Sequence, residues 1–190
     1  MACKMDHSNI SESLVQLIKD TPEAEREAGL TALISFFDTH KSNLNNTLND
    51  TYRQIHEYFE PLENHLEEIA LFSKNENAII TRIRRFVVNC AARLLIKRSM
   101  DDYLLEQISK YDMESSSFKS HSERFEKAYS TLENLISSKE ISISSECTEK
   151  LEELMRIFGE ISELERRLSR ASDHIKNVYL KVYETFYGKK

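Results

Sequence analysis

The chain has 190 residues and a formal net charge of −6 at pH 7. Charged residues make up 31% of it, whereas it has only 3 Gly, 2 Pro and no Trp. This composition favours long helices over strands, because strands need turns. The acidic balance argues against a general affinity for nucleic acid. We expect a short amphipathic segment over residues 1–20, followed by one helical domain over residues 21–190.

Signals for secretion or membrane insertion are missing from the sequence. Residues 1–6 carry no apolar run, and no stretch approaches the ~20 apolar residues of a membrane span. The cysteines Cys3, Cys90 and Cys147 are odd in number and far apart, which predicts free thiols in a reducing compartment. We therefore expect a cytoplasmic protein whose only contact with a membrane is peripheral.

The first elements are a short helix and a long one. Residues 8–20 form an amphipathic pattern that suits packing against the body, through Ile10, Leu14, Leu17 and Ile18. A sustained seam of apolar positions three and four apart then begins after Pro22, comprising Leu30, Leu33, Phe37, Leu44, Leu48, Tyr52, Ile55, Phe59, Leu62, Leu66, Ile69 and Phe72. The register continues across Pro61, which predicts a bend in the helix rather than a break. Residues 73–77 mark the turn into a second helix.

Two further long helices are predicted. The second has apolar positions at Ile80, Ile83, Val87, Cys90, Leu94, Tyr103 or Leu104, Ile108, Tyr111, Phe118, Phe125, Tyr129, Leu132 and Ile136, and we expect it to continue through Ser115–Ser117. A serine-rich loop over residues 139–148 follows. The third helix begins near Thr148, with its seam at Leu151, Leu154, Phe158, Ile161, Leu164, Leu168, Ala171, Ile175, Val178, Val182 and Phe186.

The residues that could carry chemistry do not form a recognisable site. No histidine follows a glutamate by three residues, the spacing that di-iron helical bundles use. We expect His56 and His65 at the surface, Cys90 in the core, and a solvated acidic face made of Glu57, Glu60, Glu63, Glu67 and Glu68. The sequence predicts no catalytic residue, no metal ligand and no cofactor, and therefore no enzyme.

One segment stands out by charge. Residues 77–100 contain no acidic residue but hold Arg82, Arg84, Arg85, Arg93, Lys97 and Arg98. These cations either pair with acidic faces of neighbouring helices or contact an anionic membrane, where each contributes about 1 kcal/mol. The candidate membrane-binding residues are Arg82, Arg85, Arg93, Lys97 and Arg98. A second basic set is interleaved with acidic residues and is weaker evidence: Arg166, Arg167, Arg170, Lys176 and Lys181.

The predicted architecture and several residues resemble a BAR domain, and within that family the BAR region of sorting nexins. The resemblance is carried by Tyr52, Glu57-Tyr58-Phe59-Glu60, Leu62, Phe72-Ser73, Glu76, Cys90 and Lys97-Arg98, and covers about a quarter of the chain. It implies three long, kinked, antiparallel coiled-coil helices that form a homodimer or heterodimer with a curved, membrane-binding face. The chain departs from sorting nexins in having no preceding phosphoinositide-binding PX domain and no tryptophan in the third helix.

Physical reasoning also favours a dimer. Three thin helices of this length expose more apolar seam than one chain covers, and Phe36, Phe37, Phe59 and Phe86 widen the stripe. We expect self-association through the first helix and part of the second. The first interpretation is a BAR-like dimer that binds curved anionic membranes. The alternative is a helical scaffold or adaptor subunit that binds a partner helix; an effector or toxin-like bundle stays open, although no feature favours it.

Overall fold

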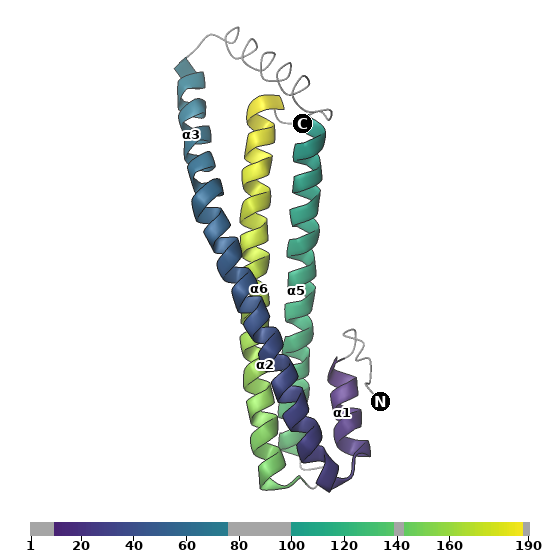
Figure 1. The fold of residues 1–190 in the computed structure, drawn as a ribbon. Helices are drawn as coiled ribbons and strands as arrows, with labels where there is room; N and C mark the ends of the chain where they lie inside the picture. Colours follow the sequence, from purple (N-terminus) through teal and green to yellow (C-terminus); the bar gives the residue numbers. More distant parts are fainter. Residues whose placement is uncertain (1–9, 76–99, 139–142, 188–190) are drawn as a thin grey trace. The chain divides into compact units, whose positions relative to one another are not determined.

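The computed structural model describes residues 10–75, 100–138 and 143–187, and almost all of these lie in helices (Figure 1). The helices are α1 (Ile10–Asp20), α2 (Glu23–Gln54), a π-helical turn η2 (Ile55–Phe59), α3 (Glu60–Asn75), α5 (Met100–Ser138) and α6 (Ser145–Tyr187). The predicted all-α class is confirmed. None of these helices is long and apolar enough to cross a membrane.

The junction between α1 and α2 is the one that the sequence predicts at Pro22. The carbonyl of Pro22 accepts the backbone N–H groups of Glu25 at 2.9 Å and Arg26 at 3.1 Å, which starts α2. The Arg26 side chain donates back to the carbonyl of Thr21 at 2.7 Å. Because proline has no N–H to satisfy and its φ is fixed in the helical range, it is well suited to a helix start.

The first long helix continues through Pro61 without a break. The turn η2 lies directly before the proline, and the backbone N–H of Glu60 donates to the carbonyl of Ile55, five residues earlier. A wider π turn at this point accommodates a residue that lacks an N–H and whose ring would clash with the preceding turn. The prediction that the helix is not interrupted at Pro61 is therefore confirmed.

The predicted seam of the first helix needs one correction. Tyr52 is 40% exposed, whereas Thr51 is half-buried between the buried side chains of Leu48 and Ile55. Spacings of three then four and of four then three fit a heptad seam equally well, so spacing alone does not choose between positions 51 and 52. The other predicted seam positions from Leu30 to Leu66 are buried or half-buried.

The second long helix is continuous through its serines, as predicted, over the part that the structure describes. Ser115 is buried, and its hydroxyl is 3.0 Å from that of Ser169 on α6. Leu104 is 4% exposed and Tyr103 is 43% exposed, so Leu104 is the seam residue of that pair.

The third long helix begins three residues before the predicted start at Thr148. The Ser144 hydroxyl accepts the backbone N–H of Cys147 at 3.3 Å, and the Ser144 carbonyl accepts that of Thr148 at 3.0 Å. Ser144 is therefore the N-cap of α6, in which a serine hydroxyl satisfies an otherwise unpaired helix N–H. The prediction treated this serine as loop, although serine is among the preferred N-cap residues.

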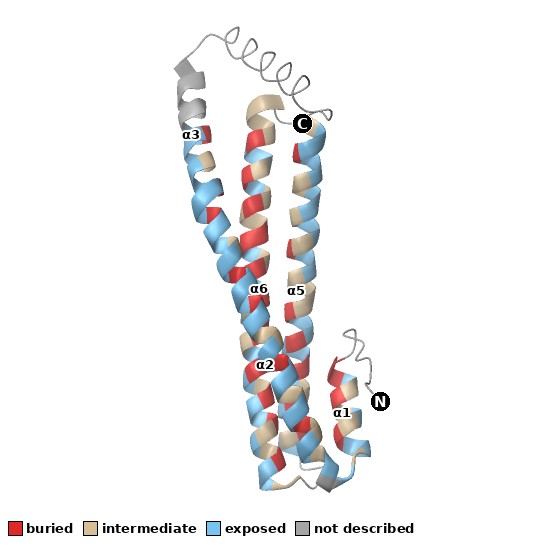
Figure 2. Cartoon of the chain, viewed as in Figure 1, coloured by how far each residue is buried: buried red, intermediate tan, exposed pale blue. Residues whose placement is uncertain are grey.

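The chain divides into two compact units, each built from several helices. Unit 1 comprises the described residues up to Asn49 together with Ser117–Leu168, and unit 2 comprises the described residues of Asp50–Ser116 and of the segment from Ser169 onward. In both units the buried residues lie along one face of each helix, and the opposite faces are exposed (Figure 2). This is the pattern of amphipathic helices around an apolar core.

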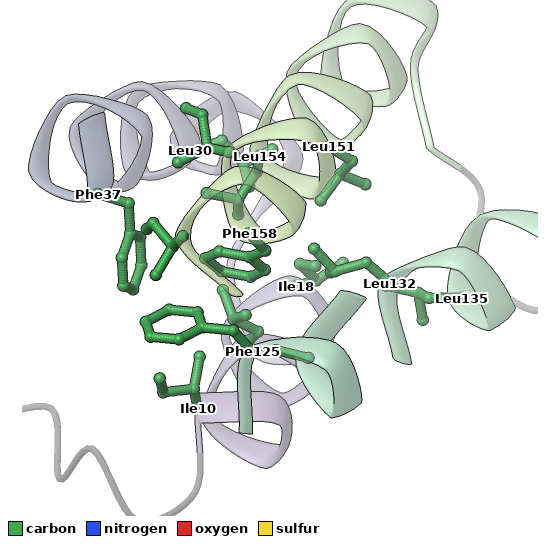
Figure 3. Close-up of a cluster of buried hydrophobic side chains, with 14 of the residues drawn as sticks. Ile10, Ile18, Leu30, Phe37, Phe125, Leu132, Leu135, Leu151, Leu154 and Phe158 are labelled. Atoms are coloured by element: carbon green, nitrogen blue, oxygen red, sulfur yellow. The ribbon is translucent and has the colours of Figure 1, made fainter. Parts of the chain in front are cut away.

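The core of unit 1 is dense and aromatic. Figure 3 shows the rings of Phe37, Phe125 and Phe158 converging from α2, α5 and α6. Phe158 packs edge-on against Phe37 with ring centroids 4.9 Å apart. From α1, Leu14 and Ile18 are at most 1% exposed in the same cluster, which confirms that the short first helix packs against the body.

Unit 2 has two smaller clusters. One joins Ile55 and Phe59 to α6 side chains that include Ile175, and the other joins Leu66, Leu104 and Val182. Among the described residues of unit 2 there is no short helix comparable to α1.

Candidate functional site

The predicted membrane-binding residues Arg82, Arg85, Arg93, Lys97 and Arg98 lie outside the described residues, as do Arg84, Phe86 and Cys90. The second basic set is described in part. Arg166 pairs with Glu126 on α5 and with Glu163 at 3.2 Å, and Lys176 pairs with Asp112 at 3.0 Å. These cations of α6 are held by neighbouring carboxylates, as interleaved charges predict.

The predicted acidic face is solvated only in part. Glu57, Glu60 and Glu67 are exposed, and Glu60 accepts a contact from the exposed His56 at 2.9 Å. Glu63 is different, because it pairs with Lys181 and lies 3.8 Å from His174, both on α6. No three His, Cys, Asp or Glu side chains within the described ranges are arranged to hold a metal ion. Cys147, the one cysteine that the structure describes, is a buried free thiol.

The most open surface of the described structure lies in unit 2. All the largest fully buried side chains of the described ranges belong to unit 1. By contrast, every exposed large hydrophobic side chain apart from Phe36 belongs to unit 2: Tyr52, Tyr58, Tyr103, Leu105, Met113 and Leu180. Unit 2 therefore leaves much more apolar surface in contact with water than unit 1.

A groove of about 570 Å³ lies on unit 2. Its lining mixes charged and aromatic side chains: Arg53, Gln54, Glu57, Tyr58, Phe59 and Leu62 from the first long helix, Tyr111 from α5 and Tyr179 from α6. Its floor includes Phe59, Tyr111 and Tyr179; the two tyrosine rings are stacked with centroids 5.9 Å apart, and Phe59 lies edge-on to Tyr179 at 5.5 Å. Burial, assisted by a hydrogen bond with Tyr103, raises the pKa of Tyr179 well above its usual value. Tyr58 stands at the edge of the groove and is 65% exposed.

A second feature is a partly open cavity of about 180 Å³ in unit 1, lined by residues of four helices. Its walls are mainly apolar and aromatic: Ile10 from α1, Phe36, Phe37 and His40 from α2, His121, Arg124 and Phe125 from α5, and Glu165 from α6. The Ile10 side chain points toward the Phe125 ring (Figure 3). The His40 ring stacks against the same Phe125 ring, with the two centroids 6.1 Å apart.

Glu165 is the unusual member of this cavity. It is 2% exposed, and its Oε2 atom is buried without a hydrogen-bond partner among the described residues. The other oxygen, Oε1, lies 3.7 Å from Nδ1 of His121. Burial raises the pKa of Glu165 from 4.5 to about 7, because the charged carboxylate loses its hydration. A buried carboxyl with an unsatisfied oxygen is costly and is a common mark of functional sites.

The sequence prediction treated Glu165 only as an acidic residue between basic ones. Glu165 lies four residues after Ile161 and three before Leu168. It therefore fits the heptad spacing of the seam as well as Leu164, which lies three after Ile161 and four before Leu168. A carboxylate at that spacing is the signal that could have identified it.

No protein-family model matches this chain, and the comparisons with characterised proteins and with solved structures likewise give no match.

Proposed function

We propose that the chain is a non-enzymatic, BAR-like module that forms a homodimer through unit 2 and binds curved anionic membranes. In this proposal its three long helices are antiparallel and coiled around one another, and the second helix carries the membrane-binding cations. The observation that carries the proposal is the groove of unit 2 with its exposed aromatic rings. The core of unit 1, by contrast, holds the largest fully buried side chains.

The occupant that we propose for the groove is a helix of a second copy of the chain. In unit 1, α1 packs on the parts of α2, α5 and α6 that belong to this unit, and its Leu14 and Ile18 are completely buried. A helix of similar amphipathic character would do the same in unit 2, and the long helices of an identical chain have this character. Covering Tyr58 alone would bury roughly 100 Å² more, or about 2.5 kcal/mol.

Sedimentation velocity at micromolar concentration tests the dimer. We expect the mass of two chains for the wild type and of one chain for Tyr58→Glu, because the substitution replaces a large exposed ring of the groove with a charge that association would bury. Met113→Glu is the matched control: Met113 is also in unit 2 and 71% exposed, but it does not line the groove. A wild-type protein that sediments as one chain would refute the dimer.

Membrane binding rests on the acid-free basic segment at residues 77–100. At about 1 kcal/mol for each cation near an anionic leaflet, reversing Arg82, Arg85 and Arg93 to Glu should weaken binding by at least about 100-fold. Co-sedimentation with phosphatidylserine-rich vesicles measures this, and neutral vesicles should bind neither protein. The control reverses the exposed lysines Lys110, Lys119 and Lys127, which changes the net charge equally. Equal loss in both variants would indicate that net charge, rather than this segment, determines binding.

The alternative is a helical scaffold or adaptor subunit whose groove receives a helix of another protein. It predicts a single-chain mass, no binding to anionic vesicles, and capture of one defined partner that the Tyr58→Glu variant fails to capture.

A further inference from the structure

The cavity in unit 1 has the composition of a small-molecule site. One side is a buried carboxyl, and most of the rest is aromatic or aliphatic. Sites of this kind bind a ligand through apolar contacts and fix its orientation with a few polar groups. We propose that this cavity binds a small apolar molecule that carries a protonated amine, with the Glu165 carboxylate as the counter-ion.

The unsatisfied oxygen of Glu165 determines the polar end of the ligand. Oε2 is buried and accepts no hydrogen bond from the described residues, and Oε1 is 3.7 Å from His121, beyond hydrogen-bond distance. An ammonium group offers three donors and a positive charge, so it would satisfy this oxygen and neutralise the carboxylate together. Phe36, Phe37 and Phe125 also line the cavity, and aromatic rings favour an organic cation where it lies over a ring face.

The volume of the cavity limits the size of the apolar part of the ligand. An apolar cavity of roughly 150 Å³ is large enough for benzene, and this cavity measures about 180 Å³. One six-membered ring with a methylene and an amine is therefore the appropriate size, and benzylamine is a suitable probe. Phe36, which is 52% exposed, lies where the cavity meets the surface and gives the ligand a route of entry.

The remaining polar groups determine how binding depends on pH. His121 and Arg124 face the cavity from α5 and His40 faces it from α2, while α1 contributes Ile10. Protonated histidines would repel an ammonium, and a protonated Glu165 would not attract it. Raising the pH ionises Glu165, so benzylamine should bind more tightly at pH 8 than at pH 5.5. A neutral ligand of the same shape, toluene, should show no such dependence.

Isothermal titration calorimetry of the full chain with benzylamine, toluene and benzoate tests the proposal. At pH 8 the wild type should bind benzylamine at least about tenfold more tightly than toluene, and benzoate should bind least. Glu165→Gln should remove the preference for benzylamine and leave toluene binding intact, whereas the exposed Glu153→Gln should change neither. If the Glu165→Gln variant fails to bind toluene, the wild type alone still tests the proposal, through its affinities for the three ligands at the two pH values.

Three outcomes would overturn the proposal. The first is a wild type that binds benzylamine no more tightly than toluene. The second is tighter binding of benzoate, which would assign the cavity to anions held by Arg124 and the histidines. The third is a wild type that binds none of the three.

Discussion

The buried carboxyl of Glu165 should make the protein less stable as the pH rises from about 4.5 to about 7. In the folded chain burial holds its pKa at about 7, against 4.5 for the free side chain. Between these two values the folded state binds more protons than the unfolded state, so the free energy of unfolding falls with increasing pH. The penalty is absent below about pH 4.5 and is complete above pH 7.

The magnitude follows from the difference between the two pKa values. At 1.36 kcal/mol for each pKa unit, 4.5 against about 7 corresponds to roughly 3 kcal/mol. Glu165→Gln keeps the shape of the side chain and cannot ionise, so its stability should lack this component. The variant should therefore gain about 3 kcal/mol relative to the wild type between pH 4.5 and pH 8. This is a large part of the 5–15 kcal/mol stability typical of folded proteins.

Urea denaturation at half-unit steps of pH measures the difference. Glu153→Gln, on the exposed side of the same helix, controls for the loss of one negative charge and should follow the wild type at every pH. A difference between Glu165→Gln and the wild type that stays constant within about 1 kcal/mol across this range would show that the carboxyl is hydrated, contrary to the reasoning.

Two predictions concern the fold. Phe158 is fully buried against Phe37, so Phe158→Ala should lower the free energy of unfolding by about 3–5 kcal/mol, whereas Phe36→Ala, at a half-exposed ring, should cost less than about 1 kcal/mol; similar losses in chemical denaturation would contradict the assigned core. Ser144→Ala should cost about 1 kcal/mol through the lost N-cap of α6, and the exposed Ser145→Ala should stay within about 0.5 kcal/mol; equal effects of the two would mean that Ser144 does not cap the helix.

The periodicity of the sequence is sufficient to predict the helices but not every seam position. Between Leu48 and Ile55 the prediction selects Tyr52 rather than Thr51, and between Ile161 and Leu168 it selects Leu164 and passes over Glu165. In both intervals two positions satisfy the heptad spacing, and the more apolar residue is the natural choice. In the structure the less apolar residue, Thr51 or Glu165, is the more buried one in each interval. The packing of the neighbouring helices determines this, and the spacing in one sequence does not show it.

The π turn is a further feature that the sequence does not specify. Ile55 and Phe59 are both buried, whereas Tyr58 is largely exposed. The seam passes from Ile55 to Phe59, as the spacing predicts, and η2 spans these same five residues. Pro61 indicates that the helix is perturbed nearby, but it does not specify a π turn.

The serines of the second and third long helices account for the register of their pairing. Ser122 lies 2.9 Å from Ser162 in unit 1, and Ser115 lies 3.0 Å from Ser169 in unit 2. Ser122 lies seven residues after Ser115 on α5, and Ser162 lies seven residues before Ser169 on α6. Both pairs therefore fit the same antiparallel register. A heptad seam of apolar residues alone could slip by seven residues at little cost. After such a slip only one serine pair could re-form, and the other two serines would lose their partners, at about 1–3 kcal/mol for a hydroxyl that stays buried. The residues that weaken the apolar pattern in the sequence are therefore those that make the pairing unique.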